Sequence, residues 1–299
     1  MRIATSTCSH EKALWEKEPR YTCEEALYAL KAAGFRVVDM NFESYCRYNG
    51  PMTQGNWKEW CENIKKLADE LGLEICLAHA HFFIQNADDT INDWDNELIR
   101  RCIEGAGIMG VKWMVFHPYS LSVNGWYNRS KSMAYNIETF SDYERQCRPL
   151  GVHLAIENLF ATTKTRSSRF GNDPQELIEL VDTLNKDLEE KSFGICWDFG
   201  HAHLNGIDQS AALREIGKRL HALHVDDNHG MTDEHLAPYF GTIEWAPIMR
   251  ALHEIGYEGD FTYEIFRFHY GLPDELQALT LEYTYKIAEY MLSIASDNT

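Results

Sequence analysis

Basic residues are scarce in this chain of 299 residues, in which 28 Lys and Arg side chains stand against 46 Asp and Glu, a net charge of −18. A negative field of this size repels phosphodiester backbones and anionic lipid surfaces. Long apolar runs are also missing, since no stretch approaches the ~20 residues that cross a membrane and MRIATSTCSHEK has no apolar signal core. We therefore expect a soluble, unprocessed, cytoplasmic protein that binds neither nucleic acid nor membrane.

The sequence also lacks the paired cysteines of a redox or zinc motif. None of its eight cysteines forms a C-x-x-C pair, and several lie in apolar runs such as EICLAH and FGICWDF. A free thiol in such a run packs as a small hydrophobic group. This cysteine usage is typical of a reducing compartment, which agrees with a cytoplasmic protein.

Short apolar runs rich in β-branched and aromatic residues recur along the whole chain, separated by segments with helical spacing. We expect eight of these runs to be strands: 2–7, 35–42, 73–80, 111–118, 152–159, 193–199, 220–227 and 260–266. Helices are expected between them, for example at 23–34, 57–72 and 174–185. Runs that are apolar throughout are covered on both faces, and intervening helices imply parallel strands with right-handed crossovers.

Eight such units in 299 residues fit an α/β protein of the (β/α)8 TIM-barrel type, for which ~250 residues is typical. A doubly wound open sheet is the alternative fold. It is disfavoured because neither G-x-G-x-x-G nor G-x-x-x-x-G-K-[ST] follows any of the runs. No linker or low-complexity segment interrupts the pattern, so we predict one TIM-barrel domain over residues 1–299.

Polar residues that bind metals close most of the predicted strands, at the end of a barrel where active sites lie. They are His79 and His81, His117, Glu157, Asp198 with His201, His224, and Glu264. Burying several carboxylates together costs several kcal/mol for each unpaired charge, on the order of the penalty for a buried ion. A divalent cation removes that cost, and three carboxylates with one imidazole suit Mn²⁺, Zn²⁺, Co²⁺ or Mg²⁺. The lack of a thiolate argues against a closed structural zinc site.

Five segments resemble the sugar phosphate isomerase/epimerase superfamily, a group of xylose-isomerase-like TIM barrels. They are IEN at 156–158, WDFGHAHLNG at 197–206, LHVDDN at 223–228, DEHLAPYFGTI at 233–243 and TYEI at 262–265. The resemblance implies one divalent metal ion, with Zn²⁺ or Mn²⁺ favoured, and no organic cofactor. The ligands that it implies are Glu157, Asp198, His224 and Glu264.

The resemblance also implies a reaction. Glu157 and Glu264 would be the catalytic acid/base pair, removing and returning a proton next to a carbonyl while the metal neutralises the enediolate charge. Isomerisation, epimerisation and dehydration of a keto-inositol all begin with this step, and the sequence does not separate them. Gly230 stands where several ketose epimerases of the superfamily place an arginine, so the substrate contacts differ here.

A small sugar or polyol is the expected substrate, and several side chains are candidates to bind it. His79, His81 and His117 line the pocket or contact the metal, and the resemblance places His201 on the substrate or on a second metal. Asp233 and His235 follow the seventh strand and either bind sugar hydroxyls or hold further metals. The first role is favoured, because a second cation needs its own carboxylates and most of those near the site are committed to the first. Arg166 and Arg169 lie in the loop 160–173, which either binds an anionic or hydroxyl-rich substrate or is simply solvated.

Aromatic residues near the predicted strand ends are candidates for an apolar face against a sugar: Trp15, Phe82, Trp126 and Phe160. Self-association into a homo-oligomer is compatible with the sequence.

A class-II apurinic endonuclease is the main alternative function. Those enzymes share the fold and bind three zinc ions, and look-alikes of the additional ligands are present: His79, His117, His201, Asp233 and His235. The charge of −18 argues against a duplex-DNA surface. A non-catalytic sugar-binding barrel is disfavoured because it has no use for two buried glutamates on one metal. The number of bound ions separates the first two functions.

Overall fold

Eight parallel strands form a barrel in the computed structural model, which describes residues 1–10, 22–47, 49–82, 91–161, 168–269 and 272–296. The barrel order is β10-β1-β2-β3-β4-β7-β8-β9, which follows the chain apart from β10 lying beside β1. The strands are β1 Arg2–Ser6, β2 Val37–Asn41, β3 Glu74–His79, β4 Trp113–Phe116, β7 His153–Glu157, β8 Phe193–Asp198, β9 Leu220–His224 and β10 Asp260–Tyr263. Each lies within one of the eight predicted runs, so the predicted TIM-barrel fold is confirmed.

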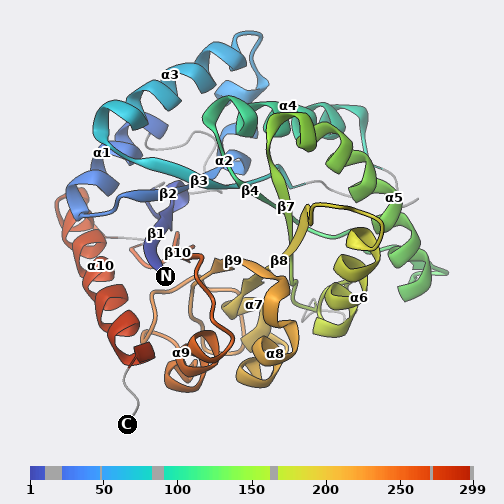
Figure 1. The fold of residues 1–299 in the computed structure, drawn as a ribbon. Coiled ribbons are helices and arrows are strands. Elements are labelled where there is room, and N and C mark those ends of the chain that lie inside the picture. Colours follow the sequence, from blue (N-terminus) through green and yellow to red (C-terminus); the bar gives the residue numbers. More distant parts are fainter. Residues whose placement is uncertain (11–21, 48, 83–90, 162–167, 270–271, 297–299) are drawn as a thin grey trace.

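The barrel closes between β9 and β10 through a single bridge. Val225 pairs with Tyr263 in parallel, the amide of Val225 donates to the carbonyl of Thr262 at 2.8 Å, and the amide of Glu264 donates to Val225 at 3.2 Å. The other seven junctions are parallel ladders, and two of them contain a register shift, at Val38/Asp39 between β2 and β3 and at Ile195/Cys196 between β8 and β9. In Figure 1, which looks along the barrel, the ring of strands is surrounded by helices.

Ten α-helices are found in the described residues: α1 Cys23–Ala33, α2 Phe42–Cys46, α3 Trp57–Leu71, α4 Asp93–Met109, α5 Arg129–Cys147, α6 Pro174–Asn185, α7 Phe199–Leu204, α8 Gln209–Ile216, α9 Trp245–Glu254 and α10 Asp274–Ser296. Short 3-10 turns lie at η1 Thr7–His10, η2 Pro51–Thr53, η3 Arg148–Leu150 and η4 Gly217–Arg219. The helices α1, α3 and α6 match the three ranges predicted from spacing. None of the described helices is long and apolar enough to cross a membrane.

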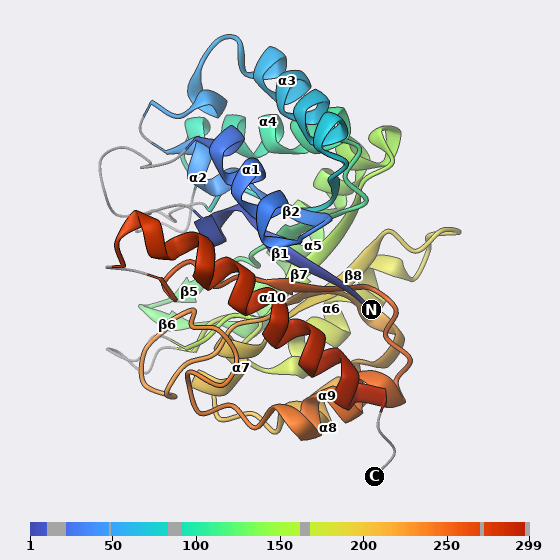
Figure 2. The same cartoon turned by 90° about the vertical axis from the view of Figure 1, so that its left-hand side faces the viewer.

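A small hairpin follows β4 on the face where the strands end. Its strands, β5 Ser122–Val123 and β6 Trp126–Tyr127, are joined by Asn124 and Gly125, which both have positive φ, as a two-residue hairpin turn requires. Figure 2 shows β5 and β6 on the side opposite the N-terminus, where β1 begins. The indole of Trp126 is 79% exposed at this hairpin.

The inside of the barrel has two layers of opposite character. The lower layer is small and apolar, and consists of Ala4, Val37, Cys76, Leu77, Val115, Ala155, Cys196 and Ala222. Because side chains alternate along a strand, the residue two positions later points to the same side. Apart from Cys76, which Ala78 follows two positions later, the residues reached in this way are polar and form the upper layer: Ser6, Asp39, His79, His117, Glu157, Asp198 and His224, to which the eighth strand run adds Glu264. The fold thus gathers one polar side chain from each strand run.

Candidate metal centre

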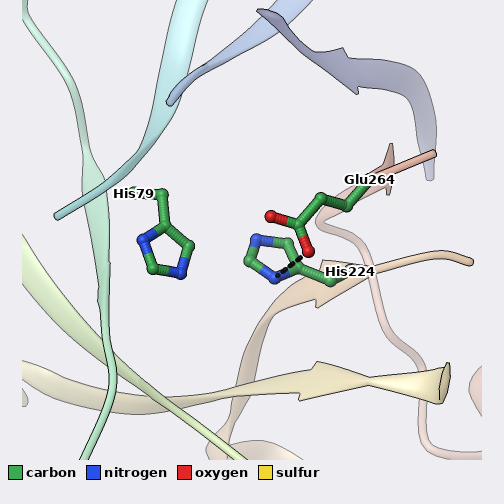
Figure 3. Close-up of side chains that lie close together, drawn as sticks. All are labelled: His79, His224 and Glu264. Atoms are coloured by element: carbon green, nitrogen blue, oxygen red, sulfur yellow. Dashed lines mark ion pairs between the residues drawn. The ribbon is translucent and has the colours of Figure 1, made fainter. Parts of the chain in front are cut away.

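The four predicted metal ligands converge at the end of the barrel. The ligand atoms of Glu157, Asp198, His224 and Glu264 all lie within 4.8 Å of one another, and all four residues are buried. His224 Nδ1 is 3.2 Å from Glu157 Oε1, 3.5 Å from Glu264 Oε2 and 4.0 Å from Asp198 Oδ2. Figure 3 shows the Glu264 carboxylate turned toward the His224 imidazole, with His79 beside them.

The three carboxyl groups differ in their pKa values. Burial raises the pKa of Glu264 well above its usual range, and the charges of Glu157 and Asp198 add to this effect. Burial likewise raises the pKa of Asp198, to about 7. Burial also disfavours the charge on Glu157, but the imidazoles of His224 and His117 outweigh it and hold that pKa well below its usual range. One carboxyl is therefore held as an anion while its neighbours resist ionisation.

The donor set fits a divalent cation. Asp198 Oδ2 is fully buried and makes no hydrogen bond to any residue that the structure describes. An unpartnered buried carboxylate oxygen costs free energy, on the order of a few kcal/mol, unless a cation or proton meets it. Three carboxylates and an imidazole nitrogen are ligands that Zn²⁺ and Mn²⁺ accept.

Asp198 also explains the D-x-x-H spacing. It ends β8 and caps α7, because its Oδ1 accepts the backbone N–H of His201 at 2.6 Å. The cap fixes His201 in the first turn of α7, with Nδ1 3.4 Å from Glu157 Oε1. A strand-ending carboxylate that caps the next helix therefore brings a histidine three residues later to the same site.

Three imidazoles have their orientation set by a backbone carbonyl. Nδ1 of His79 donates to Ala80 at 2.9 Å, Nδ1 of His201 to Asn158 at 2.9 Å, and Nδ1 of His235 to Glu264 at 2.8 Å. A carbonyl only accepts, so in each neutral ring the lone pair is on Nε2.

Each Nε2 faces a carboxylate oxygen. Burial lowers the pKa of His201 and His235, but the nearby carboxylates outweigh it and raise both pKa values. Nε2 of His79 is 3.0 Å from Glu157 Oε2, Nε2 of His235 is 3.1 Å from Asp233 Oδ2, and Nε2 of His201 is 3.9 Å from Asp233 Oδ1. Two acceptors so close repel unless a proton or a cation lies between them. A histidine whose Nδ1–H is tied to a carbonyl is the usual arrangement of a metal ligand.

A group of His79, His224 and Glu264 overlaps the central four, and two further groups of potential ligands flank them. His79, His117 and Glu157 form one group, and Glu157 belongs to the central group as well. His201, Asp233 and His235 form the other. Beside it, Asp226 is fully buried, and its Oδ2 lies 3.7 Å from His235 Nδ1 and makes no hydrogen bond within the described part of the chain.

His81 lies apart from these groups. Its two ring nitrogens bond to Glu43 at 2.8 Å and Asp95 at 3.0 Å. Burial lowers the pKa of His81, but the two carboxylates outweigh it and raise that pKa to about 9. The Glu43 carboxylate also accepts the backbone N–H of Phe82 at 2.6 Å, so His81 braces the segment after β3.

Two of the candidate aromatic residues pack against the site. The ring of Phe82 stacks on His117 with centroids 4.4 Å apart, and that of Phe160 lies 5.0 Å from His201. Arg169 is partly buried, and burial lowers the pKa of its guanidinium. It lies near Gly171, whose carbonyl accepts the backbone N–H of Leu159 after β7. Arg166 and Trp15 lie outside the described residues.

The polar stretch after β9 is braced from within. The Asp227 carboxylate accepts from the amides of Tyr239 and Ile243 at 3.0 and 3.1 Å and from the indole of Trp245 at 3.0 Å. Asp226 accepts the amide of Gly200 at 2.9 Å. Both carboxylates are fully buried, which excludes a solvated turn at this point. The bracing presents Asp233 and His235 to the site.

Two residues of the polar layer, Ser6 and Asp39, had no role in the sequence interpretation. Asp39 is fully buried in β2, inside the run FRVVDMNF. An aspartate within an otherwise apolar buried strand is the signal that identifies it, because an ionised carboxylate is rarely buried without a partner.

The comparisons with known proteins agree with this fold. The model of the family described as Xylose isomerase-like TIM barrel matches residues 27–286. The chain belongs to this family. The protein MJ1311 of Methanocaldococcus jannaschii is 27% identical over 266 residues, 85% of this chain and 86% of that protein. Inosose isomerase of Bacillus subtilis is 25% identical over 201 residues, 64% of this chain and 67% of the enzyme.

Solved structures of this barrel family include several sugar epimerases. A D-tagatose 3-epimerase-like protein superposes with a TM-score of 0.74 at 20% identity, covering 99% of this chain and 98% of the other. The 3-keto-D-glucoside 4-epimerase YcjR of E. coli superposes with a TM-score of 0.69 at 17% identity, covering 96% and 99% of the two chains. At these identities the likeness shows the shared fold.

Proposed function

We propose that this chain is a metal-dependent sugar isomerase or epimerase that moves a proton next to a carbonyl. The observation that carries the proposal is the buried group of Glu157, Asp198, His224 and Glu264, whose ligand atoms lie within 4.8 Å of one another. The similarity to inosose isomerase and to sugar epimerases supports the substrate class. Zn²⁺ or Mn²⁺ suits the four ligands, and when bound it would supply positive charge for the developing enediolate.

The two glutamates divide the proton transfer between them. Histidines hold Glu157 as an anion, whereas burial favours the protonated form of Glu264. Opposite displacements of two neighbouring pKa values are what an acid/base pair requires. Glu157 is therefore assigned as the base that removes the proton and Glu264 as the acid that returns one. Phe82 and Phe160 shield the histidines beside them from water.

Deuterium incorporation tests this proposal. The chain, loaded with Zn²⁺ or Mn²⁺, is incubated with ketohexoses and inososes in D₂O, and the carbon-bound deuterium is measured. Glu157→Gln and Glu264→Gln are each expected to lower kcat by about 100-fold or more, the usual worth of a general acid or base. Glu144→Gln is the matched control, because Glu144 is a buried glutamate of α5 that pairs with Arg148, the first residue of η3. Normal turnover by either site variant would remove that glutamate from the mechanism, and a wild type that labels no sugar would refute the function.

Hydrolysis of a phosphodiester by three metal ions is a second candidate function. It is favoured by the groups His79–His117–Glu157 and His201–Asp233–His235, which flank the central four. Neighbouring cations stabilise the attacking and leaving oxygens of a phosphoryl transfer. The net charge of −18 opposes binding to duplex DNA. Three bound ions per chain together with cleavage of abasic DNA would establish this function, whereas one ion and sugar turnover would exclude it.

A further inference from the structure

The side chain of Asn158, the residue after Glu157, makes a two-point contact with the backbone of β8. Its exposure is 0%. Nδ2 donates to the carbonyl of Asp198 at 2.8 Å, and Oδ1 accepts the amide of Asp198 at 2.6 Å. A side-chain amide offers one donor and one acceptor side by side, as a peptide group does in a ladder. Since Glu157 pairs with Cys196, Asn158 continues the pairing of β7 with β8 beyond the last paired residues.

Asp198 is the residue whose orientation this contact fixes. Its Oδ1 is taken up by the cap of α7, where it accepts the amide of His201 at 2.6 Å. Its Oδ2 makes no hydrogen bond to a described residue and lies 4.0 Å from His224 Nδ1, on the side of the metal centre. A short side chain in a staggered rotamer follows its backbone. Holding both backbone groups of Asp198 therefore holds the direction of Oδ2.

Asn158 also contacts the histidine that follows Asp198. The backbone carbonyl of Asn158 accepts from His201 Nδ1 at 2.9 Å, and the same nitrogen lies 3.4 Å from Glu157 Oε1. One residue thus holds the carboxylate that ends β8 through its side chain and the imidazole on α7 through its main chain. A displacement of Asn158 would move both groups relative to Glu157.

The same two-point contact occurs at the other end of β8, away from the metal centre. Asn185, the last residue of α6, donates from Nδ2 to the carbonyl of Phe193 at 2.8 Å and accepts the amide of Phe193 at 3.2 Å. Asn185 is also buried, and Phe193 is the first residue of β8. The two asparagines hold the two ends of one strand by the same bonds. They differ in that only Asn158 holds a candidate metal ligand.

We propose that Asn158 is a positioning residue of the metal centre, whose amide fixes Asp198 so that Oδ2 points to the ion and whose carbonyl keeps His201 beside Glu157. The inference rests on the proposed function in that it takes Asp198 as a metal ligand. Asn158 acts through these two residues and touches neither ion nor substrate. Groups that hydrogen-bond to ligand residues in this way commonly determine the affinity of a metal site.

Metal affinity, measured against the matched asparagine, tests the role of Asn158. Asn158→Ala and Asn185→Ala are compared with the wild type for binding of Zn²⁺ and Mn²⁺ by competition with a chromophoric chelator. Each variant loses the same two hydrogen bonds to β8, so both are expected to lower the urea midpoint to a similar extent. Asn158→Ala is also expected to weaken metal binding by about 10- to 100-fold. Asn185→Ala is expected to bind the ions as the wild type does.

The visible absorption of the Co²⁺-loaded protein supplies the second measurement, because it depends on the number and geometry of the ligands. Asn158→Leu is added as a variant of nearly the same shape, which fills the space of the asparagine and makes neither bond. The Co²⁺ spectrum is expected to change in Asn158→Ala and Asn158→Leu and to stay unchanged in Asn185→Ala.

Unchanged affinity and spectrum in both Asn158 variants, with normal circular dichroism, would overturn the proposal. An equal loss of affinity in Asn158→Ala and Asn185→Ala would overturn it as well, because the effect would then come from general weakening of β8. If Asn158→Ala does not fold, Asn158→Leu decides. Neither measurement needs a sugar, so a wild type that binds the ions without sugar turnover would refute the proposed function and leave the result on Asn158 standing.

Discussion

Replacement of Asp227 by alanine is expected to destabilise the loop that carries Asp233 and His235. The carboxylate is 0% exposed and accepts from the amide of Ile243 at 3.1 Å and the indole of Trp245 at 3.0 Å, both buried, and from the partly buried amide of Tyr239 at 3.0 Å. Each buried donor left without an acceptor costs about 1–3 kcal/mol. The two buried donors and the partly buried third give an expected loss of about 3–5 kcal/mol in the free energy of unfolding.

Urea denaturation measures this loss, with chelator competition as a parallel measure of metal binding. The Asp208→Ala variant is the control, because Asp208 caps α8 at an exposed site and its removal costs only about 1 kcal/mol. Zn²⁺ binding at the group of His201, Asp233 and His235, where the wild type shows it, is expected to weaken in Asp227→Ala, since Asp233 and His235 lie in the loop that Asp227 holds. A loss below about 1 kcal/mol would refute the reasoning, because it would mean that the stranded donors find other partners.

Two further predictions concern the surroundings of the site. The pKa of His81 is raised to about 9, so its contribution to stability is complete below an unfolded-state pKa of about 6.5 and is lost as the pH rises through 9. The melting temperature of the wild type should therefore fall more steeply between these pH values than that of His81→Gln. Parallel melting-temperature curves would contradict the raised pKa of His81. Gly200→Ala is expected to destabilise the fold by about 1–3 kcal/mol, because its Cβ would lie 2.1 Å from Asp226 Oδ2. Gly55→Ala, with no atom within 4 Å of its Cβ, should be neutral in the same denaturation experiment.

The fold follows from the sequence because each strand is marked locally. A run such as LEICLAHA is too short for a helix and too apolar for an exposed strand, so its type and its burial on both faces can be inferred without knowledge of its neighbours. The strand ends then place Glu157, Asp198, His224 and Glu264 at one end of the barrel. The structure brings their ligand atoms together.

The remaining parts of the site depend on contacts between distant segments. His79 and His81 are equivalent in the sequence, but β3 ends at His79, and His81 turns to Glu43 and Asp95 from α2 and α4. Asp39 was missed because it lies within its run and not at the end. Only the register of β2 against β1 and β3 places it in the same layer as the ligands. Such side-chain partners are fixed by tertiary packing, which the local pattern does not encode.

The way in which the barrel closes between β9 and β10 links the metal centre to the stability of the barrel. Every other strand junction carries at least three paired residues, whereas this one carries the bridge from Val225 to Tyr263. His224 and Glu264 stand on the two sides of this seam, directly beside the bridge. An ion bound by both residues would cross-link β9 and β10 at the junction that has the fewest paired residues. Binding of the ion would then also stabilise the closed barrel, and without the ion local unfolding would begin most easily between β9 and β10, beside the metal centre.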